Sequence, residues 1–323
     1  MGSCLTKTKS GLSSCWGGLS RCWDGIGCCQ IDFHCCGLWR RNFTKCCGCD
    51  CWPNFCTQGP DFDDLELGPK FQPVGLKKRA LIACYDYTND NDIYNDNISA
   101  PAEGDAIEEI LKSKFSYHPE NIVRLDDKSV SADRSTLHVL RDMVVQTQKN
   151  ETLFFYFSGR AAVNHFGSSD EPDQQDEGIM DPTGRIFSDS QFYNILKEAN
   201  EGAKIVIILE SDASGTLMDL PYHYLKSVEF KADDSDNLKA DIVSISACGD
   251  FEVAEEIELN PGQSTGVFTE VLCGILENVD VKQQTWSQLL GTIEKVFGTI
   301  NSVNQNPQLC TSKSHLSKMN VFI

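Results

Sequence analysis

Two apolar runs, each followed at once by small and charged residues, decide the fold of this chain. Residues 204–215 read KIVIILESDASG, and residues 152–161 read TLFFYFSGRA. Apolar, β-branched runs without polar alternation are typical of strands that are buried on both faces. Similar runs stand at 79–85, 121–125 and 241–247, and segments with helical spacing separate them. This alternation predicts an α/β domain whose mostly parallel central sheet is flanked by helices on both faces.

Helical patterns occupy residues 103–115, 132–148, 188–200, 264–277 and 286–298. Two of them open with capping boxes, Ser188-x-x-Gln191 and Thr285-x-x-Gln288. Binding and catalytic sites of parallel sheets form at the carboxyl ends of the strands. The segments that follow residues 157 and 209 are therefore the candidate site.

Charge and cysteine divide the 323 residues into three parts. Residues 1–56 hold six basic and three acidic residues and twelve of the 16 cysteines. Residues 57–76, with three prolines and three glycines, are predicted to be a linker to a globular domain over 77–323. The chain beyond residue 56 has 22 basic and 44 acidic residues, a balance that disfavours nucleic acid as a partner. No run of 18 apolar residues predicts a transmembrane helix.

Several motifs of the domain, in the same order, resemble those of the type I metacaspases, a family of caspase-like cysteine peptidases. They include KKRALIACYDY at 77–87, HPENIVRLDD at 118–127, TLFFYFSG at 152–159 and LESDASGTLMDLPYHY at 209–224. The resemblance extends over about residues 77–323 and implies a caspase-like (caspase-hemoglobinase) fold.

Both residues of the family's catalytic dyad are replaced. By resemblance, Arg160 stands where the general-base histidine is expected, and Asp212 stands where the nucleophilic cysteine is expected. Arginine stays protonated and cannot serve as a base, and a carboxylate cannot replace a thiolate in this chemistry. The sequence thus predicts no peptidase activity by the family mechanism. One hypothesis pairs Arg160 and Asp212 as ions across the cleft, and the alternative leaves both facing solvent.

The resemblance also implies a substrate cleft and a metal site. The family cleaves after Arg or Lys, and its acidic pocket maps onto Ala102, Asp105, Ser158 and Glu210. Here the pocket is expected to hold a basic side chain without cleaving it. The alternative is that Asp105 and Glu210 are ordinary acids of a helix start and a strand end. Weak calcium binding is predicted for Asp189, Asp219 and Asp173. The alternative is that the acidic loop is merely solvated. No cofactor is expected to be required. Cys248 is interpreted as a core thiol.

The first residues, MGSCLTK, fit N-myristoylation at Gly2, and the adjacent Cys4 suits palmitoylation. Two lipid signals together anchor a protein stably. The remaining cysteines of the head are interpreted as an acylated cluster at a membrane interface. Alternatives are a zinc site with Cys46, Cys49 and His34, disulfides, or a loosely ordered tail.

These observations predict a catalytically inactive metacaspase-like protein on the cytoplasmic face of a membrane, with plasma and flagellar or ciliary membranes as candidates. It would act by binding or regulation, with an active relative or a basic peptide as its protein partner. One alternative is an active cysteine endopeptidase that cleaves after Arg or Lys with a displaced catalytic group. Another is a structural protein of a membrane domain.

Overall fold

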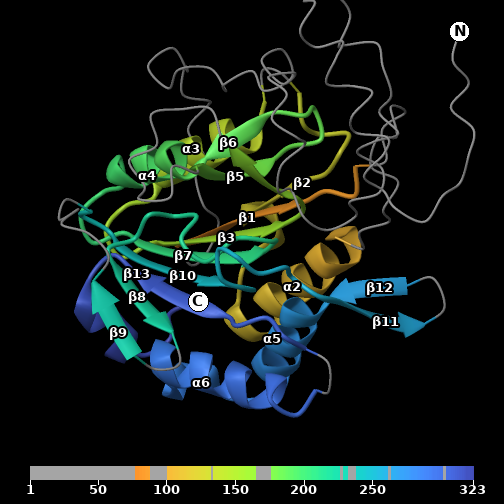
Figure 1. The fold of residues 1–323 in the computed structure, drawn as a ribbon. Helices are drawn as coiled ribbons and strands as arrows, with labels where there is room; N and C mark the ends of the chain where they lie inside the picture. The colour runs from red at the N-terminus through yellow and green to blue at the C-terminus, as the bar shows by residue number, and fades with distance from the viewer. Residues whose placement is uncertain are drawn as a thin grey trace, which may run out of the picture. The chain divides into compact units, whose positions relative to one another are not determined.

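A computed structural model describes residues 77–87, 100–131, 134–164, 176–225, 228–231, 238–260, 263–300 and 303–323. Its centre is an eight-stranded sheet in the order β2-β1-β3-β7-β10-β13-β8-β9 (Figure 1). The parallel strands are β1 (Lys78–Cys84), β2 (Ile122–Leu125), β3 (Thr152–Ser158), β7 (Lys204–Glu210) and β10 (Asp241–Ser246). The antiparallel strands at one edge are β13 (Gln308–Thr311), β8 (Tyr222–Leu225) and β9 (Val228–Lys231).

The two apolar runs form adjacent strands in the middle of this sheet. Strands β3 and β7 pair in parallel from Thr152 opposite Lys204 to Ser158 opposite Glu210. Every residue of β3 is buried, as are the last six of β7. Because both faces of these strands are covered, a run of apolar residues is stable where an alternating one would not be. The predicted fold class is confirmed.

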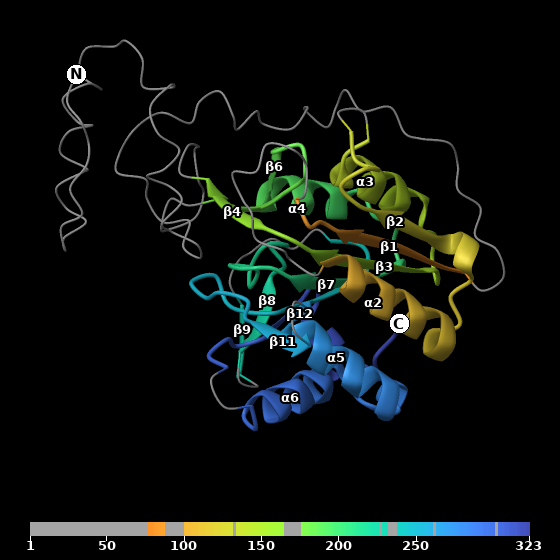
Figure 2. The same cartoon turned by 90° about the vertical axis from the view of Figure 1, so that its right-hand side faces the viewer.

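Helices cover both faces of the sheet (Figure 2). On one face lie α3 (Thr136–Gln146) and α4 (Asp189–Lys197), and on the other lie α2 (Ala100–Phe115), α5 (Val267–Asn278) and α6 (Trp286–Phe297). Both predicted capping boxes are present, at the starts of α4 and α6. Short 3-10 helices occupy Pro119–Asn121, Val281–Gln283 and Ser314–Lys318. None of the helices in the described part of the chain has the length and apolarity needed to cross a bilayer.

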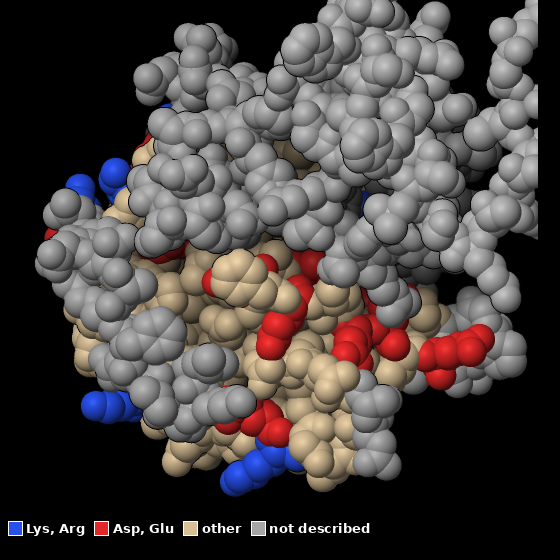
Figure 3. All heavy atoms as spheres, viewed as in Figure 1, with Lys and Arg blue, Asp and Glu red and all other residues tan. Residues whose placement is uncertain are grey.

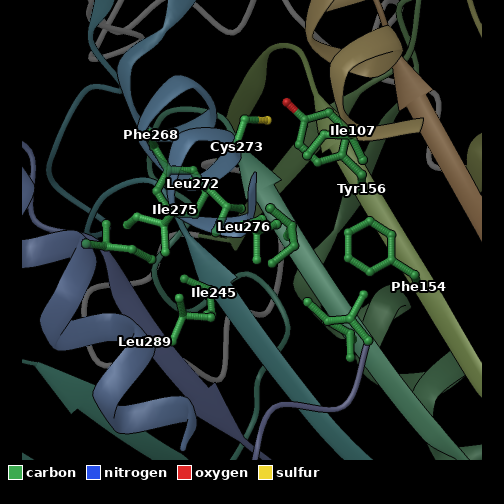
Figure 4. Close-up of a cluster of buried hydrophobic side chains, with 14 of the residues drawn as sticks. Ile107, Phe154, Tyr156, Ile245, Phe268, Leu272, Cys273, Ile275, Leu276 and Leu289 are labelled. Atoms are coloured by element: carbon green, nitrogen blue, oxygen red, sulfur yellow. The ribbon is translucent and has the colours of Figure 1, made fainter. Parts of the chain in front are cut away.

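The core on the α2, α5 and α6 side joins distant parts of the chain (Figure 4). Phe154 of β3 and Ile245 of β10 pack in one cluster with Phe268 and Leu272 of α5. Full burial of each such side chain stabilises the fold by about 1.5–3 kcal/mol. Tyr156 and Cys273 belong to the same cluster (Figure 4).

Two small sheets were not predicted. One consists of β4 (Ala161–Asn164), β5 (Asp176–Met180) and β6 (Ile186–Ser188), and the other is the hairpin of β11 (Glu256–Asn260) and β12 (Gln263–Gly266). Strand β12 occupies the start of the segment that was predicted to be helical from residue 264, so α5 begins only at Val267. The predicted head (1–56) and linker (57–76) lie outside the described residues.

Candidate functional site at the ends of strands β3 and β7

Arg160 and Asp212 follow the two central strands at the same edge of the sheet. Each stands two positions beyond a strand end, after Ser158 of β3 and Glu210 of β7, and these two strand ends are paired in register. Parallel neighbours bring their carboxyl ends to one edge. The topology thus brings Arg160 and Asp212 to the same edge of the sheet, and their standing in place of a catalytic dyad stays a prediction. Their pairing as ions stays a prediction.

Arg160 is held in a framework of backbone hydrogen bonds. Its N–H donates to Tyr87 Oη at 2.7 Å, and its carbonyl accepts from the Met180 N–H at 3.0 Å. Tyr87 in turn donates its hydroxyl to the Met180 carbonyl at 2.7 Å. The guanidinium carbon of Arg160 lies 5.1 Å from the centre of the Tyr87 ring, a cation–π distance. Arg160 therefore has a defined, half-buried position beside an aromatic ring.

Asp212 is tied to the loop that follows β10. Its Oδ1 accepts the Ala254 N–H at 2.7 Å. The next residue, Ala213, has a φ of 46° and donates its N–H to the Glu252 carbonyl at 3.1 Å. A left-handed alanine costs on the order of 1 kcal/mol, so this turn is held by its surroundings. The Asp212 carboxylate therefore helps to fix the position of the loop that contains Ala254.

Cys248 is the thiol beside this turn. Its Sγ lies 3.4 Å from the Ser211 carbonyl, 3.5 Å from the Glu252 carbonyl and 3.9 Å from Ser214 Oγ. The side chain is fully buried, and this burial raises the pKa of the thiol to about 12. A thiolate is the reactive form of cysteine, so Cys248 is a poor nucleophile in this structure. The placement agrees with its interpretation as a core thiol.

A buried carboxyl, Glu103 of α2, lies beside the end of β3. Its Oε2 accepts from Ser158 Oγ at 2.6 Å and from Tyr156 Oη at 3.0 Å. Its Oε1 accepts the Gly266 N–H at 2.6 Å, with Thr265 Oγ1 at 3.4 Å. The two oxygens of Glu103 thus have hydrogen-bond donors on both sides, although the residue is only 4% exposed.

Glu210 is the second buried carboxyl of this site. Its Oε2 accepts both the N–H and the hydroxyl of Thr269 at 2.6 Å, and Thr269 Oγ1 lies 2.7 Å from Tyr156 Oη. Its Oε1 is buried and has no hydrogen-bond partner. Burial raises the pKa of Glu210 well above its usual value, and the negative charge of Glu103 raises it further. Glu103 and Glu210 thus form an electrostatically coupled pair.

The structure brings together only some of the residues that were predicted to form the substrate pocket. Ser158 and Glu210 lie together, but Asp105 does not join them: its side chain is 80% exposed, and it pairs with Arg124 at 3.2 Å. Ala102 is also exposed. The physical reason is helix phase, because two positions along a helix rotate a side chain by about 200°. The acid that faces the site is Glu103.

A signal for Glu103 was present in the sequence. Ala100, Glu103, Ile107 and Ile110 follow a three-and-four spacing, and all four are buried on one face of α2. An acid at an apolar-face position is unusual, and this marks it as a candidate for a special role.

The predicted calcium ligands are not brought into one cluster by the described residues. Asp189 is buried at the first turn of α4, where its Oδ1 accepts the Ser190 N–H. Asp219 lies in a turn with a φ of 47°, and Asp173 lies outside the described residues. Within the described ranges, no group of three or more His, Cys, Asp or Glu side chains could hold a metal ion. These residues alone do not fit a calcium site. Gly2 and Cys4 also lie outside the described part.

Comparison with known proteins finds a family whose model resembles part of this chain. Residues 78–221 match the family described as "Metacaspase, peptidase C14 domain", a span that includes Arg160 and Asp212. Metacaspase-1 of Plasmodium falciparum is 27% identical over 224 residues, which make up 64% of this chain and 35% of that protein. Metacaspase-1 of Schizosaccharomyces pombe is 23% identical over 307 residues, which make up 76% of this chain and 69% of that protein.

The chain spans about a third of the length of the Plasmodium relative. Among solved structures, the crystal structure of a Geobacter sulfurreducens protein superposes with a TM-score of 0.54 at 17% identity. The match covers 73% of this chain and 93% of that one, and it shows the fold alone. The family that these similarities support for residues 78–221 is therefore that of the metacaspases, the C14 family of cysteine peptidases.

Proposed function

We propose that this protein is a catalytically silent relative of the metacaspases that acts by binding or regulation. The observation that carries the proposal is the pair of residues at the ends of β3 and β7, Arg160 and Asp212. Loss of both the nucleophile and the base typically costs a cysteine or serine peptidase about 10^6-fold in rate. Neither replacement restores a base beside a thiolate.

The surroundings of the two residues support this proposal. Asp212 uses a carboxylate oxygen to accept the Ala254 N–H, and Arg160 lies against the Tyr87 ring. The thiol at hand, Cys248, is buried with a raised pKa. A working peptidase with a displaced nucleophile would need this thiol exposed, ionised and next to a base.

The binding partner is proposed to be a basic polypeptide, either a peptide segment or an active relative that presents one. The chain beyond residue 56 has a net charge of −22 from 22 basic and 44 acidic residues. Acidic side chains gather over the hairpin of β11 and β12, where Glu256 and Glu258 are exposed, and basic ones lie toward the margins of that view (Figure 3). Such a surface attracts cations and speeds their association.

Membrane anchoring is the second part of the proposal. Myristoylation at Gly2 and palmitoylation at Cys4 would hold the protein on the cytoplasmic face of a membrane. Replacement of Gly2 by alanine is expected to move the protein to the soluble fraction, and hydroxylamine is expected to release the wild type. A Gly2→Ala variant that stays on membranes would refute lipid anchoring.

An activity assay tests the central claim. Wild type, Asp212→Ala and Cys248→Ser are incubated with fluorogenic Arg and Lys peptides, with and without calcium, beside an active Arg-cleaving peptidase as a control. We expect no cleavage above buffer from any of the three. Turnover that is lost in Cys248→Ser and kept in Asp212→Ala would instead establish the displaced-nucleophile peptidase.

A further inference from the structure

Phe251, in the loop that follows β10, is the most exposed large hydrophobic side chain in the described part of the chain. Its exposure is 85%, against 36% for Val279 and for Met319. A single exposed apolar residue is common on protein surfaces and says little by itself. Phe251 differs from such residues in the way its loop is held and in the charges that flank it.

Phe251 stands in a turn that is fixed on both sides of the ring. The Glu252 N–H closes the turn by donating to the Gly249 carbonyl at 3.0 Å. Before the ring, Asp250 Oδ1 accepts the Thr216 N–H at 2.8 Å. After the ring, Glu252 Oε2 accepts the Gly249 N–H at 3.0 Å. The turn therefore presents the aromatic ring to solvent from a backbone that is held in place.

The same turn is joined to the residues that follow β7. Ala213 donates its N–H to the Glu252 carbonyl at 3.1 Å, and Asp212 Oδ1 accepts the Ala254 N–H at 2.7 Å. Ligands of parallel sheets bind at the carboxyl ends of the strands. Phe251 therefore lies in a loop that borders the edge of the sheet where a polypeptide ligand is expected.

The carboxylates on either side of the ring, Asp250 and Glu252, form no ion pair within the described ranges. Their hydrogen-bond donors are backbone N–H groups and the side-chain amide of Asn306, all of which are neutral. The exposed acids of β11 follow a few residues later in the chain. A ligand that covers Phe251 therefore meets unbalanced negative charge, which basic groups match best.

This combination of an apolar ring and negative charge selects among the candidate occupants. A second copy of the domain would bring its own excess of acids, since the chain beyond residue 56 has a net charge of −22. Nucleic acid and anionic lipid surfaces are repelled for the same reason. A polypeptide with an apolar side chain among basic ones would bury the ring and match the carboxylates together.

We propose that Phe251 is the apolar anchor of the surface that binds the partner, and that the partner segment carries an apolar side chain flanked by basic ones. A ring on a fixed turn loses little conformational freedom on binding, so more of the gain from its buried apolar area appears as affinity. This inference rests on the proposed function, in which a basic polypeptide is the partner, and adds what that segment must contain besides its charge.

A double-mutant cycle between protein and peptide tests the anchor. Full-length wild type, Phe251→Ala and Phe251→Tyr are titrated by fluorescence anisotropy against a labelled peptide in which one leucine is flanked by arginines on both sides. Its twin has serine in place of leucine and the same charge. The matched control is Val279→Ala, which truncates an exposed apolar side chain at the C-terminal end of α5. Circular dichroism confirms that each variant is folded.

We expect Phe251→Ala to weaken binding of the leucine peptide by about tenfold or more, as truncation of a central anchor does. Its binding of the serine peptide should differ from that of wild type by less than about twofold. Phe251→Tyr keeps the ring and Val279→Ala leaves the turn unchanged, so both should bind the leucine peptide as wild type does.

An equal loss for both peptides, or no loss for either, would overturn the anchor and leave the proposed function standing. Failure of wild type to bind either peptide below about 1 mM would refute the basic partner of the proposed function together with the anchor. Mass spectrometry of the peptides reads catalytic silence separately, because cleavage by wild type would refute that silence without bearing on the ratio of the affinities.

Discussion

Replacement of Glu210 by glutamine removes one ionisable group from the buried pair and leaves the shape of the side chain nearly unchanged. Burial, and then the neighbouring Glu103, raise the pKa of Glu210 well above its usual value. Over the pH range between its unfolded and folded pKa values, the folded protein holds a proton that the unfolded chain has released. A rise in pH through that range therefore lowers the free energy of unfolding.

The effect is measured as the slope of the free energy of unfolding against pH. A difference of one bound proton changes the free energy of unfolding by about 1.4 kcal/mol per pH unit. As the pH rises above the usual pKa of a glutamate, the free energy of unfolding of wild type should fall at up to this rate because Glu210 loses its proton on unfolding. Glu210→Gln lacks this proton and should not show the fall. The amide oxygen can keep both hydrogen bonds from Thr269. The free energy of unfolding of Glu210→Gln is thus expected to be within about 1 kcal/mol of the wild-type value near pH 5. Near pH 8 it is expected to be higher than the wild-type value.

Urea unfolding, followed by far-ultraviolet circular dichroism from about pH 5 to about pH 8, measures this slope. The matched control is Asp105→Asn, since Asp105 lies on the same helix as Glu103 with its side chain 80% exposed. The control should follow wild type. Parallel pH profiles for wild type and Glu210→Gln would refute the reasoning, because they would mean that water reaches Glu210 and that it titrates as a solvated carboxyl.

Three further outcomes follow from burial. Phe154→Ala, at a residue only 1% exposed, should lower the free energy of unfolding by about 3–5 kcal/mol, whereas Phe251→Ala, at 85% exposure, should change it by less than about 0.5 kcal/mol, both measured in urea. Iodoacetamide near pH 8 should label Cys248 only in denaturant, since burial raises its pKa to about 12, and peptide mass spectrometry detects any native labelling that contradicts this. Glu151→Gln should lower the free energy of unfolding, measured by heat or urea, by about 3–5 kcal/mol, because it removes the charge 2.9 Å from the buried Arg79 guanidinium. An unchanged free energy of unfolding would show that water reaches this pair.

The sequence by itself determined the central strands of the sheet and two of the helix starts. The apolar runs at 152–157 and 204–209 could become only buried strands, because they have no polar face to turn toward water. The capping boxes at Ser188 and Thr285 fixed two helix starts through contacts between residues three apart. The sequence also placed Arg160 and Asp212 at one edge of the sheet, because each follows a recognisable strand by two positions.

The tertiary structure decided which acids are buried at the strand ends. Glu103, and not Asp105, faces Ser158 because the phase of α2 against the sheet selects which side chains point inward. Its bond to the Gly266 N–H joins residues 163 positions apart, and a contact of that separation leaves no periodic trace in the sequence. Strand β12 formed where local spacing favoured a helix, because pairing with β11 satisfies its backbone hydrogen bonds. Local sequence patterns determined most of the helices and strands, whereas packing between distant elements determined which side chains meet at the strand ends.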